Sequence, residues 1–384
     1  MLAVREVAVS GYRSLRRIGF SVDDLSVFVG GNGTGKTNLY RALELLQAAA
    51  LGTLTRDLAA EGGMDSVLWA GRRRQGEPAR LCLSVSMRDD ETGQVFAYTV
   101  EIGLVPQAGA EIYGAAFRQE PQVKAERLTV RNGGRTAVIL DRDGRSGFVR
   151  DADGRKQSLG IDLLATETAL GSALIATGQP EIARVRLAMT AWRFHHGFRT
   201  DADSPLRRPC LAVTTPTLAS DGSDLAAVFA TLAHIRQDTT DLDEAIDGAF
   251  PGARLIVPEP VREASFGVTF PDFAKRIFDA SELSDGTLRF LALAGALLGY
   301  RLPPFIALNE PETSLHPDLM EPLARLIARA AERTQVWLVT HSDRLADAIA
   351  ASGGPRPRTV LKRDGETWIE GLRLSGTFAE ADDD

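Results

Sequence analysis

The distribution of apolar residues predicts short buried strands followed by amphipathic helices near both ends of the chain. Residues 25–29 form an apolar run that ends in glycines, as expected of a buried strand, and leucines then recur at helical spacing through residues 36–50. Past residue 270 the same alternation returns. Strands are predicted at 305–308 and 335–339, helices at 287–300, 317–333 and 342–351, and a hairpin around Asp364-Gly365.

The middle of the chain has a different pattern. Residues 81–157 contain strand-like runs separated by strong turn dipeptides, which predicts an antiparallel β region. These dipeptides are Asn132-Gly133, Asp143-Gly144 and Asp153-Gly154. From about 161 to 250, alanine and leucine recur among scattered charges with few β-branched runs. This composition predicts a mostly helical insert.

Composition narrows the class of protein. The 384 residues have room for two domains, and the net charge of −7 argues against a protein that mainly coats nucleic acid. The two cysteines, Cys82 and Cys210, are far apart and suggest neither a disulfide framework nor a zinc site. No signal peptide is evident, and the longest apolar run, 290–300, is about half the ~20 residues that a membrane span needs. We therefore expect a cytoplasmic protein that does not enter a membrane.

Between the first strand and the first helix lies the pattern G-x-x-x-x-G-K-[ST]. Its glycines let backbone N–H groups surround phosphate oxygens, its lysine reaches the outer phosphates, and its threonine can bind Mg²⁺. The following helix also directs its positive end at the anion. An accidental glycine-rich turn would not require these flanking elements. The predicted nucleotide-binding residues are Gly30, Gly31, Asn32, Gly33, Thr34, Gly35, Lys36, Thr37 and Asn38.

Three further motifs follow in the last third of the chain. "LSDGT" at 283–287 places Ser284 and Gly286 where a loop becomes a helix, so the serine can cap the helix and free N–H groups can bind an anion. "FIALNEPETSLHP" at 305–317 is an apolar strand that ends in carboxylates, and "VTHS" follows at 339–342. Taken alone, "SDG" is an ordinary helix start. Because "LSDGT" precedes the apolar strand that ends in the carboxylates of "NEPE", a functional interpretation is favoured.

In this order, the P-loop, "LSDGT", "NEPE" and a late histidine resemble the ATP-binding cassette ATPases, and within them the SMC/RecF-like branch. "GYRSL" before the first strand and "EPETSLHP" resemble motifs of that branch. The resemblance covers about 2–51 and 278–374. It implies an α/β fold, a P-loop ABC/SMC-type ATPase head with a mixed central sheet, an antiparallel β layer and a helical insert. The expected regions are 1–158 (lobe I), 159–270 (the insert, in place of a long coiled coil) and 271–384 (lobe II).

The resemblance also implies roles for individual residues. Glu310 would polarise the attacking water, Lys36 would reach the outer phosphates and His341 would sense the γ-phosphate. Without the resemblance, His341 is a strand-end histidine that could equally be structural. Ser284 and Gly286 would contact the γ-phosphate held by a second subunit, so that ATP is bound between two heads. Further implied contacts are Ser314 across that interface and Arg13 close to the nucleotide. The implied cofactors are ATP and Mg²⁺, and the implied assembly is an ATP-dependent homodimer.

Two departures from the family pattern affect these expectations. Family heads have aspartate where Asn309 stands, and with Thr37 this position contributes to the metal site. Asparagine still accepts a hydrogen bond but carries no charge, so metal affinity and turnover should be lower. The glutamine of the family's Q-loop is not identified among Gln107, Gln119 and Gln179. The pair His195-His196 shows no metal-ligand spacing.

The sequence thus predicts a slow, dimer-dependent ATPase whose heads engage on ATP and act on DNA or on a partner protein, in repair or in defence. A rival hypothesis is a nucleotide-gated binding module that turns over little and controls a separate effector. A small-molecule kinase would leave "LSDGT" and "NEPE" unexplained. The basic stretches 71–76 and 205–209 are either exposed turns or DNA contacts. We expect no nuclease domain after the final hairpin, so any cutting of nucleic acid would need a partner.

Overall fold

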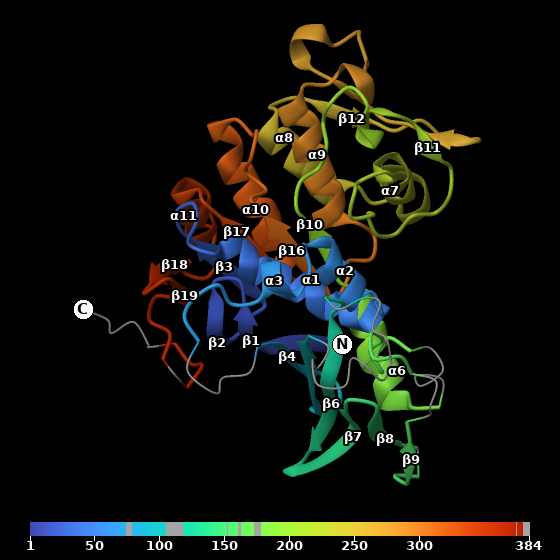
Figure 1. The fold of residues 1–384 in the computed structure, drawn as a ribbon. Coiled ribbons are helices and arrows are strands. Elements are labelled where there is room, and N and C mark those ends of the chain that lie inside the picture. The colour runs from blue at the N-terminus through green and yellow to red at the C-terminus, as the bar shows by residue number, and fades with distance from the viewer. Residues whose placement is uncertain are drawn as a thin grey trace. The chain divides into compact units, whose positions relative to one another are not determined.

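A computed structural model of the protein describes residues 1–73, 79–104, 117, 119–151, 153–159, 163–172, 178–373 and 375–378. The chain forms two compact units (Figure 1). Unit 1 comprises Met1–Asp23, Gly30–Trp192 and Thr359–Asp384, and unit 2 comprises Asp24–Val29 and Arg193–Arg358. Each unit therefore combines segments from distant parts of the sequence.

Unit 1 is built on an eight-stranded sheet in the order β2-β1-β4-β5-β6-β7-β8-β9, in which every neighbouring pair is antiparallel. Along β4, Leu81, Leu83 and Val85 are buried while the residues between them are partly exposed, so one face of the strand packs on the core. The three predicted turn dipeptides lie at the β6–β7, β7–β8 and β8–β9 connections, which confirms the predicted antiparallel region. The strands are β1 (Leu2–Tyr12), β2 (Leu15–Ser21), β4 (Arg80–Asp89), β5 (Val95–Gly103), β6 (Gln122–Asn132), β7 (Arg135–Asp143), β8 (Ser146–Arg150) and β9 (Lys156–Ser158).

The apolar face of this sheet is covered by the helix that follows the P-loop. Helix α1 (Lys36–Leu51) buries the predicted Leu39, Leu43 and Leu46 and contacts β1, β4 and α6 (Pro180–Thr190). Gly52, in a left-handed conformation, ends the helix as a C-cap. The remaining elements of unit 1 are α2 (Leu54–Ala60), α3 (Met64–Val67) and the predicted terminal hairpin β18 (Arg358–Arg363) and β19 (Glu366–Ile369).

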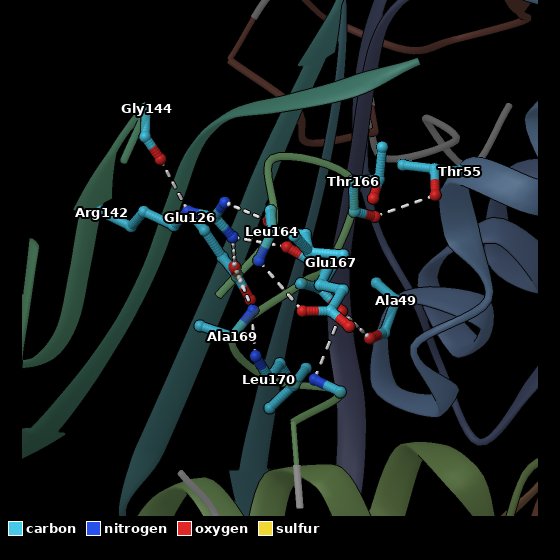
Figure 2. Close-up of polar contacts among 12 residues, drawn as sticks. Ala49, Thr55, Glu126, Arg142, Gly144, Leu164, Thr166, Glu167, Ala169 and Leu170 are labelled. Atoms are coloured by element: carbon cyan, nitrogen blue, oxygen red, sulfur yellow. Dashed lines mark hydrogen bonds and ion pairs between the residues drawn. The ribbon is translucent and has the colours of Figure 1, made fainter. Parts of the chain in front are cut away.

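A buried ionic network attaches the segment 163–172 to the sheet (Figure 2). Glu126 of β6 is 1% exposed, and both of its carboxylate oxygens accept hydrogen bonds. The donors are the Tyr98 hydroxyl at 2.9 Å and the backbone N–H groups of Ala169 and Leu170 at 2.6 and 2.7 Å. Arg142 of β7 lies 3.7 Å from the same carboxylate. The charge of Glu126 is thus paired and hydrogen-bonded, as a buried carboxylate requires.

The same segment also contacts the P-loop helix. Arg142 donates to the carbonyls of Leu164 and Glu167 at 3.0 and 2.5 Å (Figure 2). The Thr168 hydroxyl donates to the carbonyl of Ala49, in the last turn of α1, at 2.6 Å. Segment 163–172 therefore joins the sheet to the end of α1 by polar contacts that are largely buried.

Unit 2 contains the parallel strands β10 (Arg193–His195), β16 (Phe305–Asn309), β17 (Gln335–Thr340) and β3 (Leu25–Val29), in that order. Strands β16, β17 and β3 are buried throughout, as expected of a parallel sheet covered on both faces. The predicted strands and helices of this region are confirmed, although the helix predicted at 317–333 begins with a 3-10 turn. These helices are α9 (Asp285–Leu298), η5 (Pro317–Leu319), α10 (Met320–Ala331) and α11 (Asp343–Ala351).

The remainder of unit 2 mixes helices with very short strands. The sequence predicts a mostly helical region here and does not predict these strands, because two or three residues are too few to show an alternating pattern. No helix in the described part of the chain is both long and apolar enough to cross a membrane. The elements are η1 (Pro205–Arg207), β11 (Cys210–Leu211), α7 (Leu225–Ala230), the π-helix η2 (Thr231–Arg236), α8 (Thr240–Ala249), β12 (Arg254–Ile256), β13 (Glu263–Ala264), β14 (Gly267–Thr269), η3 (Pro271–Phe273), β15 (Phe278–Asp279) and η4 (Ala280–Glu282).

Candidate active site

Steric constraints explain two glycines of the P-loop. Gly35 is the N-cap of α1 and has a φ of 99°, a conformation that L side chains rarely adopt. A Cβ atom at Gly35 would lie 1.8 Å from the Thr367 hydroxyl oxygen, and one at Gly30 would lie 2.4 Å from the carbonyl oxygen of Val360. Both contacts are too short for any side chain. Hairpin β18–β19 therefore packs against the P-loop so closely that only glycine fits.

Lys36 and Thr37 form the first turn of α1. The Lys36 side chain is 4% exposed, and its Nζ donates to the carbonyls of Gly30 and Gly31 at 2.5 and 2.8 Å. Thr37 is exposed. The loop thus combines a localised cation, an accessible hydroxyl and the positive end of a sixteen-residue helix, which together suit a phosphate chain and its cation.

The "GYRSL" motif lies at the turn between β1 and β2 and reaches the P-loop through Ser14. The Ser14 hydroxyl accepts from the Asn38 amide at 2.7 Å and lies 2.6 Å from the Thr367 hydroxyl, which in turn donates to the Thr34 carbonyl at 2.8 Å. Arg13 has a positive φ of 46° and its guanidinium donates to Glu61 at 2.7 Å. The structure therefore connects Ser14 directly to the P-loop and pairs Arg13 with a carboxylate.

The carboxyl ends of three parallel strands of unit 2 lie side by side. Asn309 at the end of β16 is opposite Val339, and Thr340 at the end of β17 is opposite Val29 at the end of β3. The P-loop begins at the residue after Val29. In open α/β sheets, ligands bind beyond this edge of the strands.

Asn309 is 5% exposed and uses only one end of its amide. Its Nδ2 lies 3.0 Å from Nδ1 of His196, whereas its Oδ1 is buried without a hydrogen-bond partner among the described residues. The next residue, Glu310, has a positive φ of 48°. Such backbone strain in a residue with a side chain is most common at functional sites. The Glu310 side chain is 33% exposed, so Glu310 is more accessible than the buried Asn309.

His341 lies between two carboxylates. Its Nδ1 is 3.2 Å from an oxygen of Glu312 and 3.7 Å from an oxygen of Glu310. Glu312 is 7% exposed and its Oε1 also accepts from the Thr340 hydroxyl at 2.6 Å and from the backbone N–H of His341 at 3.1 Å. The buried Glu312 thus orients the half-exposed imidazole. Its other oxygen, Oε2, is buried and has no partner in the described residues.

Arg289 of α9 supports the backbone of this site. Its guanidinium donates to the carbonyl of Glu310 at 3.4 Å. Burial lowers the pKa of Arg289, and the negative charge of Glu312 opposes this effect. The arginine therefore supplies positive charge behind the strained residue.

The loop before α9 carries the predicted anion-binding serine. Ser284 is the N-cap of α9, and its hydroxyl accepts from the N–H of Thr287 at 3.2 Å. Arg207 donates to the carbonyl of Leu283 at 2.8 Å and to Asp285 at 2.6 Å, so it holds this loop from both sides. A Cβ atom at Gly286 would lie 3.3 Å from the carbonyl oxygen of Ser314. Within one subunit, the "LSDGT" loop and the "PETS" turn therefore pack together.

Three residues of the site were not predicted from the sequence: His196, Glu312 and Arg207. The pair His195-His196 has no metal-ligand spacing in the sequence, and only the structure shows that His196 follows β10 and contacts Asn309. Glu312 is one of two glutamates in "NEPE", and the sequence does not indicate which points inward. Arg207 belongs to a basic stretch, and its contacts with Leu283 and Asp285 favour the structural interpretation of "PLRRP".

Other predicted features lie elsewhere or outside the described residues. Of the Q-loop candidates, Gln179 is the buried N-cap of α6, Gln119 is exposed in the turn before β6, and Gln107 falls outside the described residues. The basic stretch 71–76 is described only to residue 73. These positions do not identify a Q-loop.

The predicted metal ligands are chemically suited to Mg²⁺. In the described part of the chain, no group of three or more His, Cys, Asp or Glu side chains is arranged to hold a metal. Mg²⁺ instead commonly keeps several waters and binds through one or two protein oxygens together with substrate phosphates. The exposed hydroxyl of Thr37 and the unsatisfied Oδ1 of Asn309 are oxygen donors of this kind.

Comparison with known proteins identifies the family. A family model described as "AAA domain, putative AbiEii toxin, Type IV TA system" matches residues 139–347, which is more than half of the chain. A second model, "Protein of unknown function (DUF2813)", matches residues 2–54, which include the P-loop. No curated protein matches the sequence.

Solved structures with a similar fold include SMC heads. A Thermotoga maritima SMC head domain aligns with a TM-score of 0.50 and 14% identity over 97% of this chain and 100% of its own length. An SMC head bound to the C-winged helix domain of ScpA has a TM-score of 0.50 and 16% identity, with coverage of 97% and 99%. A head with an extended coiled coil, bound to the C-terminal domain of ScpA derived from Pyrococcus furiosus, has a TM-score of 0.50 and 15% identity, with coverage of 98% and 97%.

These identities are low, so the structural similarity concerns the fold. The fold agrees with the α/β head expected from the P-loop, "LSDGT" and "NEPE" motifs. The family match covers the "LSDGT" and "NEPE" motifs and the late histidine. The chain belongs to this AAA-domain family and has the fold of an ABC/SMC-type P-loop ATPase head.

Proposed function

We propose that the protein binds ATP and hydrolyses it slowly, and that ATP joins two heads into a dimer that acts on DNA or on a partner protein. The observation that carries the proposal is the strand register of unit 2. It aligns the carboxyl ends of β16, β17 and β3. Asn309 ends β16, Glu310 follows it, and His341 follows β17. These residues therefore lie at the same edge of the sheet as the end of β3, the strand that leads into the P-loop.

The chemistry follows from the residues at this edge. Glu310 takes the proton of a water whose oxygen forms a bond to the γ-phosphorus, while the bond from that phosphorus to the bridging oxygen breaks and ADP leaves. Lys36 stabilises the negative charge on the outer phosphates. Glu312 holds the imidazole of His341, whose Nδ1 is 3.7 Å from Glu310, and this histidine responds to the γ-phosphate.

Thr37 and Asn309 would hold Mg²⁺, which when bound neutralises part of the phosphate charge. An aspartate at position 309 would bring a negative charge, whereas the amide of Asn309 brings only a dipole. Slow turnover is therefore expected.

Ser284 and Gly286 are proposed to bind the γ-phosphate held by a second copy of the chain. The capped N-terminus of the fourteen-residue helix α9 supports this role, because its N–H groups and dipole favour an anion. Arg207 keeps the loop in shape. Arg13 is proposed to lie near the nucleotide, where it would exchange part of its pairing with Glu61 for phosphate.

A second candidate function is a nucleotide-gated module that engages on ATP, turns over little and controls a separate effector. The uncharged Asn309 favours this alternative. The description of the matched family, which refers to a toxin–antitoxin system, favours defence over repair as the process served. The ATPase rate as a function of protein concentration, with and without DNA, separates the two candidates.

Head engagement is tested with Glu310→Gln. Glutamine preserves the shape of the side chain but cannot take the proton of water, so bound ATP should persist and hold two heads together. We expect a dimer with ATP and Mg²⁺ and a monomer without nucleotide, as measured by light scattering. Adding Ser284→Arg should return the protein to monomer.

The matched control is Glu321→Gln, at an exposed glutamate in the first turn of α10. It should remain monomeric after ATP is consumed. A Glu310→Gln protein that binds ATP but stays monomeric at saturation would contradict head engagement and leave a single-subunit nucleotide switch.

A further inference from the structure

His196 and Asn309 meet because of the register between two parallel strands. His195 at the end of β10 is opposite Leu308 of β16. The next residues along the chain are His196, just past β10, and Asn309, the last residue of β16. Their side chains meet with Nδ1 of the ring 3.0 Å from Nδ2 of the amide. An amide nitrogen only donates hydrogen bonds, so the ring nitrogen is the acceptor and the ring proton is on Nε2.

This contact determines which end of the Asn309 amide is available. The Nδ2 end is engaged by His196, and the Oδ1 end is buried without a partner in the described residues. An unsatisfied buried oxygen is costly, roughly 1–3 kcal/mol. Its retention at a strand end indicates that a donor or cation satisfies it in the working protein.

We propose that His196 is a positioning residue for the metal site, because it fixes the Asn309 amide with Oδ1 as the acceptor for Mg²⁺ or for a water bound to it. The inference rests on the proposed function and adds a residue to it. Only asparagine requires such a partner. An aspartate presents an oxygen in either orientation, whereas an amide turned by 180° presents N–H groups, which repel a cation.

The first test measures how the affinity for a fluorescent ATP analogue depends on Mg²⁺ concentration, a readout that does not require turnover. His196→Ala removes the acceptor and lets the amide rotate, and loss of such an outer partner typically weakens metal binding about tenfold or more. We expect the Mg²⁺ midpoint to rise about tenfold. His196→Asn, whose side-chain oxygen can occupy the place of Nδ1, should restore most of the original midpoint.

The second test is a double-mutant cycle with Asn309→Asp. In the protein that retains His196, one oxygen of the new carboxylate faces the imidazole and can accept a hydrogen bond from the ring in its Nδ1–H tautomer, so the gain in Mg²⁺ affinity should be small. In the His196→Ala background both oxygens are available, and the gain should be at least threefold larger. Melting temperatures confirm that each variant is folded.

The outcomes separate the inference from the function on which it rests. If the parent protein shows a Mg²⁺-dependent affinity that His196→Ala leaves unchanged, or if the two substitutions are additive, His196 has no positioning role and the inference is wrong. If the parent protein shows no Mg²⁺-dependent nucleotide binding at all, the proposed function and the inference both fail.

Discussion

Two buried polar clusters, one in each unit, are hydrogen-bonded to different extents. In unit 1, Glu126 has donors on both carboxylate oxygens and Arg142 nearby (Figure 2). In unit 2, Asn309 and Glu312 are also buried, yet each has one oxygen without a partner in the described residues. A satisfied network holds a fold together, whereas an unsatisfied oxygen at a strand end is available to a ligand.

The same contrast separates two neighbouring histidines. The ring of His195 is buried against Phe198, with 5.2 Å between ring centroids, and burial lowers the pKa of His195 to about 4. The exposed His196 instead contacts the partly satisfied Asn309. His195 is the last residue of β10 and His196 is the first residue beyond it. His195 therefore packs in the core, whereas His196 contacts the candidate site.

The largest effect is expected at the P-loop. Lys36→Ala should reduce ATP affinity at least a hundredfold, because charge-assisted contacts to phosphate contribute about 1.5–3 kcal/mol each. Equilibrium binding of a fluorescent ATP analogue measures this, with Lys156→Ala at the exposed strand β9 as the control. Unchanged affinity in a folded Lys36→Ala protein would mean that ATP binds elsewhere.

Glu126→Gln should cost about 3–5 kcal/mol of unfolding free energy, because it leaves the 2%-exposed Arg142 side chain unpaired and sets an amide N–H₂ against backbone donors. Chemical denaturation measures the loss. The control Glu101→Gln breaks an exposed pair with Arg80 and should cost less than about 1 kcal/mol. Equal losses of unfolding free energy in the two variants would show that the buried network of Glu126 stabilises the fold no more than an exposed ion pair does.

His195 should make stability depend on pH. Its pKa of about 4 in the fold lies below the unfolded value near 6.5, so its contribution is complete above pH 6.5 and is lost as the pH falls towards 4. The difference corresponds to about 3 kcal/mol. His195→Phe should remove this part of the pH dependence of unfolding, whereas His316→Ala, at an exposed histidine, should not. An unchanged profile in His195→Phe would show that His195 is not buried in its neutral form.

The smallest effect on stability is expected at Glu312. Glu312→Gln keeps the oxygen that accepts from Thr340 and His341 and alters only the unpartnered one, so the change in unfolding free energy should stay within about 1 kcal/mol. Turnover should nevertheless fall, because His341 loses its anionic partner. A large loss of stability with normal turnover would place Glu312 with Glu126 among the structural carboxylates.

The sequence predicts the parts of the fold that have a strong local signal. The P-loop glycines, the Asn-Gly and Asp-Gly turns and the apolar strands 25–29, 305–308 and 335–339 all have such a signal, and the structure confirms them. Strands of two or three residues, such as β11 and β13, have no period to detect. The pairing of distant segments also leaves no local pattern in the sequence.

Motifs predict some residues of the candidate site, whereas other residues reach it only through strand register, and the roles of all of them stay predictions. The motifs "NEPE" and "VTHS" predict Asn309, Glu310 and His341, and the structure places them at the ends of neighbouring strands. His196 joins them only because β10 pairs with β16 in one particular register, and Arg207 only because a loop 76 residues away in the chain folds onto it. Which glutamate of "NEPE" is buried depends on the positive φ of Glu310, which a single sequence does not reveal.

The most direct test of the account is single-turnover hydrolysis by Glu310→Gln, measured alongside its ATP affinity. If Glu310 is the general base, the variant should bind ATP with the parent affinity and hydrolyse it 10²–10⁴-fold more slowly. Hydrolysis at the parent rate, with binding intact and the protein folded, would contradict the assignment of the strand-end cluster as the site of ATP hydrolysis.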